Sequence, residues 1–167
     1  MTQDWSPFRV CAEDERPPKI RGLESPAGVL DRLRTAAFAE IQARDAFLWA
    51  SDRFDDVPRE LRDDWRELAG QEQKHLNWLL GRLEVLGGSP DDAPVSTRLW
   101  EGLLACETGK EFAVKIAQAE ERGRLAAELF RKTLAVSDPE SARIFGDIAD
   151  EEVEHVALAK RYFPESL

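Results

Sequence analysis

The chain has 167 residues and a formal net charge of −10 at pH 7, which fits one acidic globular domain. Apolar residues make up 43% and charged residues 34%, a balance that excludes a disordered chain and a membrane protein. The longest apolar run, Ala46 to Ala50, is far shorter than the roughly 20 residues that span a bilayer. The N-terminus lacks the basic and apolar pattern of a secretory signal, so we expect a cytoplasmic protein with no membrane association.

The charge and the cysteine content exclude further classes of protein. The acidic excess repels phosphate backbones, so nucleic acid is a disfavoured partner. Cys11 and Cys106 lie far apart and form no C-x-x-C pair, which excludes zinc ribbons, rubredoxin-type sites and a disulfide framework. Histidine is scarce, because His75 and His155 are the only two.

The first half of the chain predicts an irregular arm followed by a helical hairpin. Residues 1–24 lack periodicity and contain prolines that resist helix formation, so we expect an arm that packs across the outside of the fold. A serine followed by proline then starts a helix at about 26–54. After a short turn, a second helix at about 58–86 ends at Gly87-Gly88.

The second half predicts a long connection and another helical hairpin. The connection, residues 87–108, contains a small apolar helix at about 99–104 and is longer than an antiparallel hairpin needs. Helices at about 109–135 and 139–163 follow, with apolar residues spaced by threes and fours. We therefore predict an all-α fold, a four-helix bundle with one long crossover between its second and third helices.

Six residues of this predicted bundle form a repeated pattern. Each histidine follows a glutamate at the i, i+3 spacing, which places both side chains on one face of a helix. One constant shift along the chain relates the two Glu-x-x-His motifs, and the same shift relates a glutamate of the first helix to one of the third. The residues are Glu40, Glu72 and His75 in the first half and Glu120, Glu152 and His155 in the second.

The spacing also predicts that these side chains lie at one level of the bundle. Glu40 and Glu72 lie equally far along the chain from a turn centred near residue 56. Glu120 and His155 lie almost equally far from the second turn, near residue 137. Equal counts in an antiparallel hairpin bring two residues to the same depth, because both helices rise about 1.5 Å per residue.

Glu121 is the alternative to Glu120 as the core-facing glutamate of the third long helix. If Gly123 is the centre of the inward stripe, Glu120 lies about 60° from that centre and Glu121 about 160° away, at about 100° per residue. We therefore expect Glu120 to face the core and Glu121 to face water.

The chemistry of the six residues points to metal. A buried, unpaired carboxylate costs several kcal/mol or takes up a proton. Two divalent cations balance four carboxylates, and two neutral imidazoles complete the ligand shells. One glutamate from each of two helices plus Glu-x-x-His from each of two others is the ligand set of ferritin-like di-iron and di-manganese proteins. Oxygen-rich ligands without a thiolate favour iron, with manganese as the alternative.

The sequence also resembles known ferritin-like families. Segments 39–44, 71–75 and 148–155 are similar to rubrerythrin helix motifs, although the chain has no rubredoxin tail. A closer likeness, over about residues 16–163, is to an uncharacterised bacterial ferritin-like family akin to the di-iron tRNA hydroxylase. The residues that carry it include Ile41-Gln42-Ala43, Asp64-Trp65, Leu99-Trp100 and His155-Val156. The resemblance implies a ferritin-like bundle in residues 25–167, with the six residues above as metal ligands.

Small residues near the candidate ligands allow two interpretations. They are Ala36, Ala37, Ala43, Ala119, Gly123, Ala126 and Ala127. Close helix packing is the interpretation we favour for most of them, and open space beside the metals is the alternative.

The expected function is that of a di-iron oxidoreductase that activates O2 or peroxide, with hydroxylation as one form of the reaction. It would need an external electron donor and no catalytic residue beyond the metal ligands. A ferroxidase or iron-handling protein without an organic substrate is the alternative, and a metal-free helical interaction module is a third class. The sequence is compatible with assembly of the chain as a homodimer.

Overall fold

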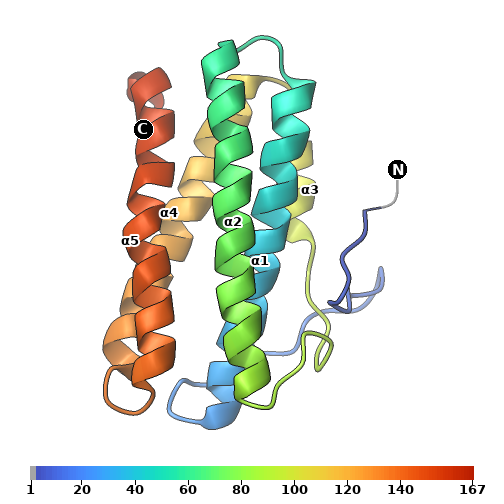
Figure 1. The fold of residues 1–167 in the computed structure, drawn as a ribbon. Helices are drawn as coiled ribbons and strands as arrows, with labels where there is room; N and C mark the ends of the chain where they lie inside the picture. Colours follow the sequence, from blue (N-terminus) through green and yellow to red (C-terminus); the bar gives the residue numbers. More distant parts are fainter. Residues whose placement is uncertain (1–2) are drawn as a thin grey trace.

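The computed structural model describes residues 3–167, and this part of the chain is all-helical (Figure 1). Its helices are α1 (Pro26–Arg53), α2 (Arg59–Val85), α3 (Arg98–Leu104), α4 (Gly109–Leu134), α5 (Pro139–Tyr162) and a final 3-10 turn, η1 (Pro164–Ser166). The predicted all-α class is confirmed, and each helix end lies within one position of that expected from the sequence. None of the helices in residues 3–167 is both long enough and apolar enough to span a membrane.

The four long helices run side by side as two hairpins (Figure 1). In one hairpin α1 packs along α2, and in the other α4 packs along α5. The contacts between the hairpins, of α1 with α4 and of α2 with α5, are much sparser. The connection from α2 to α4 passes from one end of the helices to the other and carries α3, which packs against α1 (Figure 1).

Local sequence signals begin and end these helices. The Ser25 hydroxyl accepts a hydrogen bond from the Gly28 amide at the start of α1. Thr108 and Glu111 form a reciprocal capping box at the start of α4. Gly87, just beyond α2, has a φ of 84°, a conformation that favours glycine.

The core consists of two apolar clusters with a polar layer between them. One cluster contains Leu76 and Ile148, and the other contains Leu68 and Leu158. On α2 and α5 the Glu-x-x-His motifs lie between these apolar residues. On α4, Glu120 likewise lies between residues of the two clusters. The polar layer therefore crosses the helices at one level, as the residue spacing predicted.

The described part of the arm, residues 3–24, contains no helix and packs on α1 and the α2–α4 connection. The Trp5 ring lies edge-on to both Phe38 and Trp100, with centroids 5.5 and 5.4 Å apart. Arg21 forms an ion pair with the buried Asp31 at 2.8 Å. Residues 3–24 are therefore irregular, and residues 1 and 2 of the expected arm lie outside the described part of the chain.

Candidate metal centre

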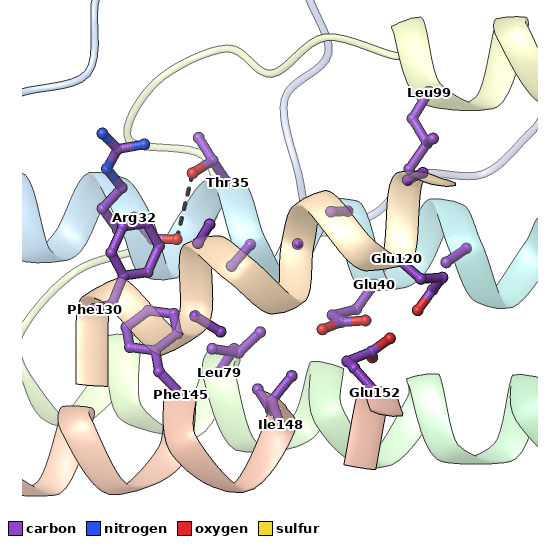
Figure 2. Close-up of a pocket in the computed structure, with 17 residues that line it drawn as sticks. Arg32, Thr35, Glu40, Leu79, Leu99, Glu120, Phe130, Phe145, Ile148 and Glu152 are labelled. Carbon is purple, nitrogen blue, oxygen red and sulfur yellow. Dashed lines mark hydrogen bonds between the residues drawn. The ribbon is translucent and has the colours of Figure 1, made fainter. Parts of the chain in front are cut away.

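The structure brings all six candidate residues together in the polar layer. Their ligand atoms form two groups, each with all atoms within 4.8 Å of one another. The first group is Glu40, Glu72, His75 and Glu152, and the second is Glu72, Glu120, Glu152 and His155. Figure 2 shows three of the carboxylates, Glu40, Glu120 and Glu152, converging from α1, α4 and α5.

Glu72 and Glu152 belong to both groups and therefore lie at the centre of the cluster. Glu40 and His75 complete one group, and Glu120 and His155 complete the other. Each group thus offers three carboxylates and one imidazole, a donor set that suits a hard or borderline divalent cation. The cluster is deeply buried: Glu72 and His75 are 0% exposed, and Glu152 is 4% exposed.

The two histidine rings face the cluster with the same nitrogen. The His155 Nδ1 atom lies 2.8 Å from Glu72 Oε1 and 3.3 Å from Glu152 Oε2. The His75 Nδ1 atom lies 3.4 Å from Glu152 Oε1 and 3.5 Å from Glu72 Oε2. The rings are nearly parallel, with centroids 5.8 Å apart.

The opposite nitrogen of each ring is held by a residue of the other hairpin. The His75 Nε2 atom lies 2.5 Å from Glu151 Oε2, and Glu151 also pairs with Lys74 at 2.6 Å. The His155 Nε2 atom lies 2.8 Å from Gln71 Oε1. A hydrogen bond to the outer ring nitrogen fixes the orientation of a metal-binding histidine.

Sequence reasoning missed these two holding residues, although a signal was present. Gln71 and Glu151 each directly precede the glutamate of a Glu-x-x-His motif, and the shift that relates the two motifs relates them too. The two histidines are therefore held symmetrically in space but by different groups, a neutral amide and a carboxylate.

Several buried atoms of the cluster have no hydrogen-bond partner. They are both carboxylate oxygens of Glu72, the Nδ1 atom of His75 and the Oε2 atom of Glu152. A buried polar atom without a partner costs about 1–3 kcal/mol, and more when it is charged. Because these orphaned atoms all point into the cluster, the residues present fit a bound cation.

The metal-free cluster shares protons among its side chains. Burial and the neighbouring carboxylates raise the pKa of Glu40 and that of Glu120 well above the usual range, which favours the protonated form of both. Burial opposes the ionisation of Glu72 and Glu152, but the close Glu40 and Glu120 carboxyls and the two histidines stabilise the ionised forms and lower the pKa of each.

The histidines carry the compensating positive charge in the metal-free cluster. Burial disfavours their charged forms, yet the close carboxylates of Glu152 and Glu72 raise the pKa of His75 to about 9. The close carboxylates of Glu120, Glu152 and Glu72 also raise the pKa of His155. The raised pKa values of Glu40, Glu120 and both histidines, together with the lowered values of Glu72 and Glu152, favour a cluster with little net charge.

Glu120 and Glu121 lie where the helix geometry predicted. Glu120 is in the cluster, whereas Glu121 forms an ion pair with Arg124 at 2.7 Å and its side chain is 39% exposed. The centre chosen for the inward stripe was wrong, because Gly123 is exposed. Glu120 is inward nevertheless, because it lies three positions after the buried Ala117 and seven before the buried Ala127, on the same face of α4.

A cavity of about 240 Å³ opens beside the cluster, between α1 and α4 (Figure 2). Glu40, Glu120 and Glu152 line one end of it, and Arg32 and Phe130 line the other. All of the small residues named above except Ala37 line this cavity, and Ala36, Ala126 and Ala127 also pack in or against the first apolar cluster. Both interpretations of the small residues therefore apply. Small side chains keep the sparse seam between the hairpins open.

Comparison with known proteins identifies the family. Residues 6–166 match the family described as "Protein of unknown function (DUF455)". The chain belongs to this family. No curated protein and no solved structure matches the chain.

Proposed function

We propose that this DUF455 chain is a ferritin-like four-helix bundle that holds two divalent metal ions, with iron as the first choice and manganese as the alternative. The observation that supports this most directly is the pair of four-residue groups that share Glu72 and Glu152. Two groups of four residues would hold two cations, and Glu72 and Glu152 would be available to both. Glu40 and His75 would complete one ligand shell, and Glu120 and His155 the other.

Charge balance supports the count of two ions. Four carboxylates and two divalent cations sum to zero, and the raised pKa values also favour little net charge in the metal-free cluster. Binding would therefore exchange up to four protons for two cations without placing a net charge in the buried layer.

The activity that we propose for this site is oxidoreduction with O2 or peroxide. When bound, a pair of ferrous ions supplies the electrons that reduce O2. In the hydroxylase form, R–H, O2, two electrons and two protons yield R–OH and water, and the electrons come from an external donor. Gln71 and Glu151 hold the histidine rings, the apolar clusters exclude bulk water, and the cavity admits a reactant to the carboxylates.

Metal analysis and O2 uptake test the proposal. Protein loaded anaerobically with ferrous iron should hold two ions per chain and consume O2, and Glu72→Ala should lose at least one ion. Glu60→Ala is the matched control, because Glu60 lies on the same helix in its exposed first turn. Wild-type protein that binds no iron or manganese would contradict the site, and O2 uptake without any organic substrate requirement would favour a ferroxidase.

A further inference from the structure

The cavity beside the cluster has a polar group at each end and an apolar body. Between Arg32 and the three carboxylates its walls are formed mainly by alanines, Gly123 and apolar side chains such as Leu79 and Ile148. Thr35 is the remaining polar residue of the wall, and its hydroxyl donates to backbone carbonyls of α1. The middle of the cavity therefore offers no free hydrogen-bonding side chain to a ligand.

Arg32 has no acidic partner in the part of the chain that the structure describes. Asp31, the residue before Arg32, pairs with Arg21 and Arg34, and Glu128, two positions from Phe130, pairs with Arg131. The Arg32 guanidinium lies over the Phe130 ring at 5.2 Å, and its Nε atom is buried without a hydrogen-bond partner. An unpaired guanidinium on an aromatic ring is a site for a carboxylate, which can accept two parallel hydrogen bonds from it.

The dimensions of the cavity limit the ligand. Its volume of about 240 Å³ accommodates about eight groups the size of a water or a methylene, at about 30 Å³ each. Arg32 and Glu40 lie a little over two turns apart on α1, which corresponds to about 12 Å along the helix axis. A cavity of this volume and length fits a slender molecule better than a bulky ring system.

We propose that the cavity binds a slender apolar carboxylate of about this length, with its carboxylate on Arg32 and its far end beside Glu40, Glu120 and Glu152. Glu152, whose Oε2 atom is buried without a hydrogen-bond partner, is one of the residues that line that inner end. That this ligand is the molecule oxidised rests on the proposed function, and oxidation would then occur at the end remote from its carboxylate. Its binding rests on the cavity alone.

Calorimetric titration of the protein with three probes, after chelator treatment and again after anaerobic incubation with ferrous iron, tests the ligand class. The probes are octanoate, 1-octanol and octylammonium, which share a chain and differ in the charge of the head group. Octanoate should bind at least tenfold more tightly than octanol, a difference of about 1.4 kcal/mol, and octylammonium should bind most weakly. Equal affinity for octanoate and octanol would overturn the assignment.

Two pairs of variants locate the binding. Arg32→Gln should weaken octanoate binding at least tenfold and leave octanol within threefold. Its control is Arg53→Gln, because Arg53 lies on the same helix and also stacks on a ring, Phe54, at 5.4 Å. If both arginine variants weaken octanoate equally, the Arg32 assignment is wrong.

The second pair fills the cavity. A side chain at Gly123 would meet nothing within 4 Å of its Cβ, and the same holds at Gly81 on α2, outside the cavity. Gly123→Leu should abolish binding of both octanoate and octanol, whereas Gly81→Leu should bind as wild type. Ala126→Leu provides a second filling variant, and circular dichroism with metal analysis verifies that each variant folds and loads. Unchanged octanoate binding in both filled variants would overturn the location.

The outcomes separate this inference from the proposed function. Octanoate binding with the expected variant pattern in a protein that neither holds metal nor consumes O2 would leave the ligand site standing and refute the oxidoreductase. Metal binding and O2 uptake without that binding pattern would refute the ligand class alone.

Discussion

Metal-free protein should lose stability as the pH rises from 5.5 to 6.5, because two glutamates of the cluster keep their protons in the folded chain. The pKa values of Glu40 and Glu120 are raised well above the usual value of 4.5 by burial and by neighbouring carboxylates. In the unfolded chain both groups lose their protons above that value. Unfolding therefore releases protons, and a rising pH favours it.

The size of the effect follows from the number of protons released. Each proton contributes about 1.4 kcal/mol of unfolding free energy per pH unit, so two protons contribute up to about 2.8 kcal/mol. For a chain of this length, 1 kcal/mol shifts the melting temperature by about 2–4 °C, which gives roughly 6–11 °C across the interval. His75 adds to the loss at higher pH, because its folded pKa of about 9 exceeds the unfolded value of 6.5.

The assay is thermal unfolding by circular dichroism, after removal of metal with a chelator, at pH 5.5, 6.0 and 6.5. The double variant Glu40→Gln, Glu120→Gln should flatten the dependence, because its amides replace protonated carboxyls. The exposed pair Glu60→Gln, Glu140→Gln is the control and should retain the wild-type slope. Ferrous iron, added anaerobically, should reverse the slope, since bound ligands must be deprotonated.

A melting temperature of metal-free protein that stays constant or rises over this interval would refute the reasoning. It would show that Glu40 and Glu120 are ionised in the folded chain, and that the cluster does not share protons as described.

Three further predictions concern the same cluster. Glu120→Ala should lose bound metal, whereas Glu121→Ala should retain it and change the unfolding free energy by no more than about 0.5 kcal/mol, as metal analysis and melting curves will show. Glu151→Ala and Gln71→Ala should each weaken metal binding by about 10–100-fold in competition titrations, because each leaves a histidine ring unheld, and the exposed Glu154→Ala should not. Loading with two cations at pH 7 should release up to four protons, measured by calorimetry in buffers of different ionisation enthalpy; release of fewer than two would contradict the proton sharing.

The sequence by itself determined the helices and the level at which the candidate metal-binding residues lie. Caps such as Ser25 and Thr108 act on backbone amides within the first helical turn, so they mark helix starts without reference to the fold. The apolar period determines which face of each helix is buried. Equal residue counts on both sides of the hairpin turns then determine the common depth of Glu40 and Glu72, because the helix rise is constant.

Only the tertiary structure decided how the two hairpins meet. The contacts of His75 with Glu151 and of His155 with Gln71 cross from one hairpin to the other, and no local period specifies the distance between hairpins. The cavity beside Gly123 also depends on the distance between the hairpins, because a run of small residues permits either close packing or a cavity. The choice depends on how far larger side chains elsewhere, in the two apolar clusters, hold α1 and α4 apart.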